Sequence, residues 1–346
     1  MEKKKLLLIG YRAFGDWLYT CSIFPRLFEQ YEVYLECNTK GYLLFHDDPR
    51  FKQIAYFADM DTTKPEDREK VFADRWDKLR AKVKPDAEIN LNGSLEIVCI
   101  AERYQDEFHL PVGERRKIFG PNGFYDAVWD RCGIPLDHTK FEPNGMHFWL
   151  DQEEHVKKWR EKHKDNFVVI MPIAGSTAQK VNHAYKDMAT AILNQYPDAI
   201  IYLAGDEACR PLFFEHPRVK SMIGADVDVK QAVHMTKYAD MVIGPETFLL
   251  VAAGMFGTPK IILATTSSVW QMAQYTKNDF SIQAPIHCSP CHRSIYYKDD
   301  CETPLLDENK EFKATACSKM FRVEDVLQRV DYVHQRWEHA RSAKDL

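Results

Sequence analysis

Short apolar runs recur through the first half of the chain and alternate with segments of helical spacing. The runs cover residues 5–9, 31–37, 53–57 and 87–91. Apolar runs without polar alternation are typical of parallel strands that are buried on both faces. Between them, apolar positions follow helical spacing over 17–28, and a charged helix is expected over 66–83. The first half therefore predicts successive βα units.

The second half repeats this alternation more clearly. Strands are expected at residues 167–171, 199–204, 219–223, 241–243 and 260–263, and helices at 151–164, 185–195, 208–214, 229–237 and 247–256. Residues 135–145, rich in Pro, Gly, His and Asp, suit a linker between the halves. The pattern predicts an α/β protein with two Rossmann-like domains and a cleft between them. We expect an N-terminal domain over 1–140, a C-terminal domain over 141–322, and a helix over 323–346 that packs back on the N-terminal domain.

Composition narrows the classes of function. The chain has 346 residues, of which 45% are hydrophobic, enough for two buried cores. Its 46 basic and 51 acidic side chains give a net charge of -5, so no overall positive field attracts nucleic acid or anionic lipid, although a local basic groove is compatible with this balance. The first apolar run is too short for a secretion signal, and no run approaches the ~20 apolar residues of a membrane span. We therefore expect a cytoplasmic protein.

Candidate site residues follow the strands at their carboxyl ends, where ligands gather in such sheets. The first segment is YRAFGDW, residues 11–17, in which Gly15 permits a tight turn and Asp16 projects from a helix N-terminus. A carboxylate there can accept the proton of an acceptor hydroxyl. Capping of the helix is the alternative interpretation of Asp16, and the two roles are compatible. Arg12 and Gly15 belong to this loop, on the acceptor side.

The second segment, residues 171–180, follows the clearest strand of the second half. Gly175, Ser176 and Thr177 allow close backbone approach and supply hydroxyls, and Lys180 supplies a cation in the same loop. Together they predict a phosphate cradle, with a plain polar turn as the alternative. The spacing of a Walker loop is absent.

Two further strand ends carry acidic residues. Asp206 and Glu207 could bind the hydroxyls of a nucleotide ribose, or cap a helix. Glu246 and Thr247 lie where a strand gives way to an apolar helix, whose first N–H groups favour an anion. Because Glu246 is itself an anion, we expect it to turn toward sugar or ribose hydroxyls.

In this order the four segments resemble the ADP-heptose:lipopolysaccharide heptosyltransferases, glycosyltransferase family 9. The strongest parts are LLLIGYRAFGDW and YADMVIGPETFLLVAAGMFGTP. The resemblance spans nearly the whole chain and implies the GT-B fold, in which two Rossmann-like domains face each other. It also implies an inverting transfer from a nucleotide-sugar donor to a hydroxyl, with no metal or other cofactor needed for catalysis.

The resemblance also implies roles for single residues. Asp16 matches the catalytic base, Lys180 the lysine that contacts donor phosphate, and Thr177 the hydroxyl beside it. Asp206 or Glu207 falls at the ribose-binding acid, and Glu246 with Thr247 falls on the family's Asp-Thr-Gly segment.

Departures from the family alter the donor end of the predicted pocket. Glu246 replaces the usual aspartate, Phe248 a glycine, and Val251 a histidine. The donor is therefore not assumed to be ADP-heptose. The segment looks closer to a divergent branch found in bacteriophage and other gene clusters, so the acceptor could be a saccharide, a lipid-linked saccharide or a modified DNA base.

Four of the nine cysteines cluster near the C-terminus, within residues 286–320. Cys288 and Cys291 form a C-x2-C pair that Cys301 and Cys317 follow, with His287 and His292 alongside. Four thiols have the count and chemistry of a tetrahedral structural zinc site, although the later gaps are not those of a standard finger. Buried free thiols and a disulfide pair are the alternatives.

The sequence is also compatible with functions other than glycosyl transfer and with further site residues. A nucleotide-binding protein that kept the fold without catalysis is the main alternative, and a nicotinamide oxidoreductase lacks its glycine fingerprint. Two Asp-x-Asp segments, 59–61 and 226–228, are interpreted as loop or cap residues rather than as a metal site. Candidates for an acceptor path, with surface charge as the plainer explanation, are Tyr42, Phe45, Arg103, Arg115, Arg116 and Lys117.

Overall fold

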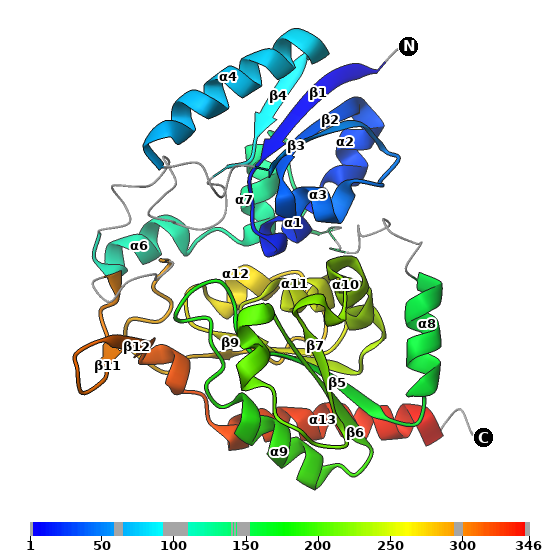
Figure 1. The fold of residues 1–346 in the computed structure, drawn as a ribbon, viewed down its shortest axis with the longest axis vertical. Coiled ribbons are helices and arrows are strands. Elements are labelled where there is room, and N and C mark those ends of the chain that lie inside the picture. Colours follow the sequence, from blue (N-terminus) through cyan, green and yellow to red (C-terminus); the bar gives the residue numbers. More distant parts are fainter. Residues whose placement is uncertain are drawn as a thin grey trace. The chain divides into compact units, whose positions relative to one another are not determined.

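The computed structural model describes residues 3–58, 65–92, 110–139, 141, 143, 153–293 and 300–342. These residues form two compact units (Figure 1). The first unit contains residues 3–58, 65–92, 124–139 and 141, and the second contains 110–123, 143, 153–293 and 300–342. Each unit is built around its own parallel sheet.

The sheet of the first unit has four strands in the order β3-β2-β1-β4. They are β1 (Lys4–Gly10), β2 (Tyr31–Asn38), β3 (Phe51–Phe57) and β4 (Ala87–Asn90). All neighbouring strands run parallel. The central strand β1 is buried from Leu6 to Gly10, which explains its continuous apolar run. Helices α2 (Phe24–Gln30) and α3 (Thr39–Phe45) lie on the opposite side of the sheet from α4 (Pro65–Val83) in Figure 1.

The single helix expected over residues 17–28 is two helices. Helix α1 (Phe14–Cys21) ends before Ser22, and α2 begins at Phe24 with Pro25 in its first turn. Proline fits a first turn because its missing N–H would have no partner there. The buried ring of Trp17 then fixes α1 against two glycines, since a Cβ on Gly10 or Gly41 would come within 2.7–2.8 Å of its ring atoms. A further helix of this unit, α7 (Phe124–Arg131), packs against α1.

The sheet of the second unit has six parallel strands in the order β10-β9-β8-β5-β6-β7. They are β5 (Phe167–Pro172), β6 (Ala199–Gly205), β7 (Val219–Ile223), β8 (Met241–Pro245), β9 (Lys260–Ala264) and β10 (Ile282–Gln283). This is the doubly wound order, in which the chain builds outward in opposite directions from the adjacent strands β5 and β8. Ligands of such sheets bind beyond the carboxyl ends of these two strands.

Helices cover both faces of this sheet. In Figure 1, α9 (Tyr185–Gln195) and α13 (Val323–Ser342) lie on one side, and α10 (Val229–Tyr238), α11 (Phe248–Phe256) and α12 (Val269–Ala273) lie on the other. No described helix is both long and apolar enough to cross a bilayer. The long helices α4 and α13 carry many charged side chains. The remaining elements of the unit are α6 (Val112–Phe119), α8 (Glu153–Lys162), η3 (Glu207–Leu212), η4 (Gly224–Asp226), β11 (Pro304–Leu306), β12 (Phe312–Thr315) and η6 (Cys317–Lys319). The α-helix expected over 208–214 is instead the 3-10 helix η3, which contains Pro211.

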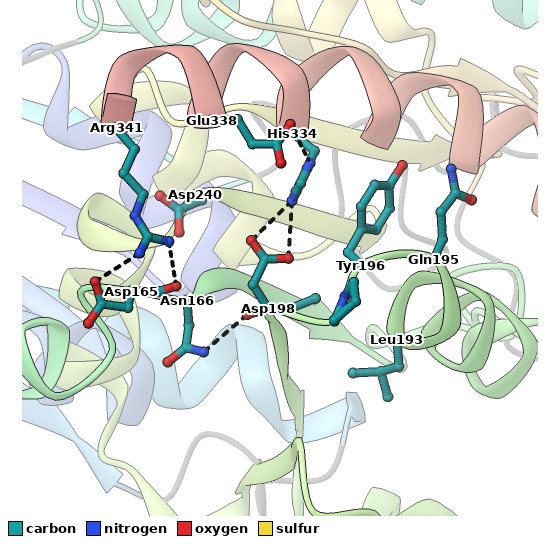
Figure 2. A network of polar contacts seen from close by, with 12 residues as sticks. Asp165, Asn166, Leu193, Gln195, Tyr196, Asp198, Asp240, His334, Glu338 and Arg341 are labelled. Carbon is teal, nitrogen blue, oxygen red and sulfur yellow. Dashed lines mark hydrogen bonds and ion pairs between the residues drawn. The ribbon is translucent and has the colours of Figure 1, made fainter. Parts of the chain in front are cut away.

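The C-terminal helix α13 is fixed within the second unit by a polar network (Figure 2). Its His334 Nε2 lies 3.2 Å from a carboxylate oxygen of Asp198, and Arg341 bonds to Asp165. Asp331 accepts hydrogen bonds from Gln195 and Tyr196 of the α9 region. These contacts join α13 to the loops at the amino ends of β5 and β6, away from the carboxyl ends where the candidate residues lie. The expected packing of this helix on the N-terminal domain stays a prediction.

Candidate functional site

The loop after β5 is shaped so that Lys180 returns to the strand end. The Gly175 N–H donates to the Lys180 carbonyl at 2.5 Å, and the Lys180 N–H donates to the Thr177 carbonyl at 3.0 Å. A Cβ on Gly175 would lie 2.9 Å from Cβ of Lys180 and 3.3 Å from the carbonyl oxygen of Glu246. Glycine is therefore needed for the close approach of this loop to the end of β8. Ser176 is exposed at the turn.

The cation of this loop is nearly buried beside a carboxylate. Lys180 Nζ lies 3.9 Å from Glu246 Oε2, and the two side chains are only 6% and 4% exposed. Burial of both charges costs solvation, which their attraction offsets only in part. The pair follows β5 and β8, so the structure brings together at the switch point two residues that are far apart in sequence.

Glu246 is oriented by main-chain groups rather than toward solvent. Its Oε1 accepts N–H bonds from Thr265 at 2.6 Å, Thr266 at 2.8 Å and Ser267 at 3.2 Å. These three residues form the loop between β9 and α12. We expected Glu246 to turn toward hydroxyls of the donor. Within the protein, one of its two carboxylate oxygens is already bonded to three main-chain N–H groups.

Three threonine hydroxyls gather at the same strand ends. Thr177 follows β5, Thr247 follows β8 and Thr266 follows β9, and the Oγ1 of each is buried without a hydrogen-bond partner among the described residues. Thr247 occupies the N-cap position of α11 but its hydroxyl makes no capping bond. Buried hydroxyls are normally satisfied, so these three can bond to the oxygens of a ligand. Thr177 and Thr247 were predicted from the sequence, whereas Thr266 was not.

The acidic residues after β6 lie on the other side of β5 from β8. Asp206 is exposed at the N-cap of η3. Glu207 accepts hydrogen bonds at 3.0 and 2.9 Å from Arg210, which lower its pKa. Arg210 also bonds to Asp226. Of the two candidates for a ribose contact, Glu207 already has a cationic partner within the protein.

Asp16 and Arg12 lie at the carboxyl end of β1 in the first unit. Asp16 and Gly15 are in the first turn of α1, where a carboxylate interacts favourably with the helix dipole. Arg12 is 5% exposed, and its Nη1 is buried with no hydrogen-bond partner in the described part of the chain. Burial lowers the pKa of Arg12, and the negative charge of Asp16 opposes this shift. The Arg12 carbonyl accepts a bond from Asn38 at 3.1 Å, which fixes the loop to the end of β2.

Of the two Asp-x-Asp segments, the structure describes only residues 226–228. Asp226 bonds to Arg210 and Ser221, and Asp228 caps α10 by accepting the Gln231 N–H at 2.9 Å. Asp228 is therefore a cap residue, as predicted, and Asp226 is the last residue of the 3-10 helix η4. Residues 59–61 lie outside the described residues.

The four clustered cysteines line one cavity. Cys288, Cys291, Cys301 and Cys317 share it with Arg115 and Arg293, among others. All four are free thiols, and burial raises the pKa of Cys291 to about 11 and that of Cys317 to about 12. As they stand, no three His, Cys, Asp or Glu side chains of the described residues are close enough to hold a metal ion. The four thiols that could bind a metal ion thus line one cavity, but their sulfur atoms are not arranged as a set of metal ligands.

Helix α6 holds the cysteine segment, which we call the cysteine module and which covers residues 286–293 and 300–319 of the described chain. Arg115 Nε donates to the Cys291 carbonyl at 2.7 Å, and Arg116 donates to the carbonyls of Pro290 and His287 at 2.9 and 2.7 Å. Arg115 is 1% exposed. Both arginines, considered above for an acceptor path, therefore have partners inside the second unit. Phe45 is likewise buried, and Arg103 lies outside the described residues.

The cysteine module is also bonded to the loops of the candidate site. Gln179 Nε2 donates to the Arg293 carbonyl at 2.7 Å, beside Lys180. The His292 N–H donates to the Thr266 carbonyl at 2.8 Å, and Ser289 Oγ donates to the Thr265 carbonyl at 2.9 Å. The module and the loops after β5 and β9 therefore form one connected structure.

No protein-family model matches the chain, and no curated protein matches its sequence. Solved structures do match. The family 9 glycosyltransferase from Veillonella parvula has a TM-score of 0.64 at 11% identity, over 96% of this chain and 98% of its own. The Escherichia coli ADP-heptose LPS heptosyltransferase II has a TM-score of 0.58 at 11% identity, over 96% and 99%. The iron-containing dodecameric glycosyltransferase TibC from enterotoxigenic E. coli has a TM-score of 0.56 at 13% identity, over 97% of this chain and 77% of its own.

This chain has the GT-B fold of these glycosyltransferases. The resemblance seen in the sequence is thereby confirmed at the level of the fold, with a parallel sheet in each unit. Identities of 11–13% concern the fold alone.

Proposed function

We propose that the protein is a glycosyltransferase that moves a sugar from a nucleoside-diphosphate sugar to an acceptor hydroxyl. One observation carries this proposal. Lys180 and the hydroxyls of Thr177, Thr247 and Thr266 follow three adjacent strands of a doubly wound sheet, at its switch point. One ammonium and several hydroxyl donors at such a place suit the oxygens of a diphosphate.

The chemistry that we propose is an inverting displacement without a metal. The acceptor oxygen forms a bond to the anomeric carbon of the sugar as the bond from that carbon to the diphosphate oxygen breaks. Asp16 takes the proton of the acceptor hydroxyl, and Lys180 with the threonine hydroxyls stabilises the charge that develops on the leaving diphosphate. The charges support these roles. The carboxylate of Asp16 can accept a proton, and the ammonium of Lys180 can stabilise a negatively charged leaving group.

The nucleotide is proposed from the solved relatives. The E. coli heptosyltransferase WaaC has been solved with ADP and with ADP-2-deoxy-2-fluoro heptose, and TibC with ADP-D-beta-D-heptose. We therefore propose an adenosine diphosphate sugar as the first donor to test, with Asp206 or Glu207 contacting the ribose. For the acceptor we propose a saccharide, with a modified DNA base of a phage context as the competitor. Each described cysteine is a free thiol, which suits a reducing cytoplasm.

We also propose that the four cysteines hold a structural metal ion. Their shared cavity and their soft thiol chemistry support this, and a metal would favour the thiolates that burial disfavours. Binding would need the four sulfur atoms to move together from the positions described above. Zinc is the ion expected from the sequence, and the iron of TibC makes iron the competitor.

A thermal-shift screen against nucleoside diphosphates and their sugars tests the proposed function. The expected result is a rise in Tm with ADP and with an ADP-sugar, followed by release of ADP when the ADP-sugar is incubated with the protein. A rise in Tm without any release, even over days, would favour the alternative of a nucleotide-binding protein without catalysis. No shift with any nucleotide would remove the basis of the proposal.

A further inference from the structure

The loop between β9 and α12 is held from two sides. Its N–H groups at Thr265, Thr266 and Ser267 all donate to one oxygen of Glu246. Its carbonyls at Thr265 and Thr266 accept bonds from the cysteine module. Because nearly every polar main-chain group of this turn is bonded, its conformation depends on a side chain from another strand.

The oxygen that binds the loop is fully used. A carboxylate oxygen has two lone pairs, and Glu246 Oε1 already accepts from three N–H donors at 2.6–3.2 Å. It therefore has no capacity left for a sugar hydroxyl. The carboxylate belongs to a side chain that is 4% exposed, which also limits its access to a ligand.

The other oxygen of Glu246 faces Lys180. The separation of 3.9 Å is an electrostatic contact rather than a short hydrogen bond. Glu246 thus holds the ammonium at the switch point. A phosphate carries more charge than this carboxylate and is the stronger acceptor for the ammonium.

The length of the side chain decides whether this arrangement is possible. Glu246 starts at the end of β8 and reaches past it to the main chain that follows β9, the neighbouring strand. An aspartate is shorter by one methylene, so its oxygen would not reach the three N–H groups from the same backbone position. A glutamine keeps an acceptor oxygen at the same reach but has no charge.

We propose that Glu246 is a positioning residue that fixes the β9–α12 loop and the ammonium of Lys180, and that it does not contact the transferred sugar. For its link to donor binding, the inference rests on the proposed function, because Lys180 is there assigned to the donor phosphate. The fixing of the loop stands on the protein alone. The two parts can therefore be tested separately.

Hydrogen exchange in the free protein tests the fixing of the loop. We expect amide exchange at residues 265–267 to be slowest in the wild type, faster in Glu246→Gln, and at least about tenfold faster than wild type in Glu246→Asp, since charged hydrogen bonds are stronger than neutral ones. In both variants, amide exchange in β6 should match the wild type. In the control variant Glu311→Gln, which removes an exposed carboxylate of the β11–β12 hairpin, exchange at residues 265–267 should also match the wild type. If the charge mattered and the reach did not, Glu246→Asp would match the wild type and Glu246→Gln would be the faster variant. That order would overturn the proposal.

Binding of ADP and of ADP-heptose tests the second part. A positioning residue affects both ligands alike, so the ratio of their Kd values should stay within about twofold of wild type in Glu246→Gln. A residue that contacts the sugar would weaken only ADP-heptose, and a change of tenfold or more in the ratio would refute the assignment. If the wild type binds neither ligand, the proposed donor is wrong, while the exchange order still decides the role of Glu246 in the loop.

Discussion

Replacement of Lys180 by methionine tests the phosphate site with little change of side-chain shape. The ammonium of Lys180 lies 3.9 Å from Glu246 Oε2 at the switch point. A hydrogen bond to a charged group contributes about 1.5–3 kcal/mol, so Lys180→Met should raise the Kd for ADP by about 10- to 150-fold. Isothermal titration of ADP into both proteins measures this difference directly.

The same replacement should also lower stability. It leaves the carboxylate of Glu246 buried beside an apolar group, and loss of one partner of a buried pair costs about 3–5 kcal/mol when the pair is tightly bonded. The contact here is 3.9 Å, and three N–H groups still stabilise the carboxylate, so we expect about 1–3 kcal/mol.

A double variant separates the two effects. Lys180→Met with Glu246→Gln removes the unpaired charge, so part of the lost Tm should return while the affinity for ADP stays low. If Lys180→Met bound ADP as tightly as the wild type does, the assignment of the phosphate site would be refuted. If the double variant regained full affinity, loss of folding rather than loss of the ammonium would explain the single variant.

Further predictions concern the base, the cysteines and acid stability. Asp16→Asn should slow sugar transfer by about 10²–10⁴-fold with an unchanged Kd for the donor; unchanged turnover would exclude Asp16 as the base. Elemental analysis of the purified protein should find about one zinc or iron per chain, and Cys288→Ala should lose the metal and lower Tm; a metal-free wild type would contradict the site. Lys237 and Tyr238 donate to Glu153 and lower its pKa to about 2. A lowered pKa in the folded state contributes stability above the ordinary pKa of about 4.3, so the Tm difference between the wild type and Glu153→Gln should be full at pH 7 and disappear as the pH falls from about 4.5 to about 2. A difference that is independent of pH would mean that the charge does not contribute.

The strands of both sheets could be predicted because buried parallel strands are continuously apolar. β7 was predicted to the residue, and β5, β6, β8 and β9 to within two residues at either end. Short helices were missed where their apolar faces are brief, as in α3, α6 and α7. Helix α12 is also short, but it begins with a capping box in which Ser268 and Gln271 bond reciprocally. The spacing of these two residues is visible in the sequence and could have identified the helix start.

The sequence predicted those residues of the candidate site that directly follow a strand. Gly175, Lys180 and Glu246 meet at the switch point because they follow adjacent strands, although strand order cannot be obtained from periodicity alone. The triad of N–H bonds to Glu246 could not be foreseen, since it depends on the register of β8 against β9. Thr266 was missed, but its polar run directly after an apolar strand is the same signal that identified Thr177.

A crystal structure of the protein with ADP tests whether the switch point of the second sheet binds the donor diphosphate. We expect a diphosphate beyond the carboxyl ends of β5 and β8, with its oxygens within hydrogen-bond distance of Lys180 Nζ and of the hydroxyls of Thr177, Thr247 or Thr266. A nucleotide bound elsewhere, with Lys180 and these hydroxyls unchanged, would contradict it.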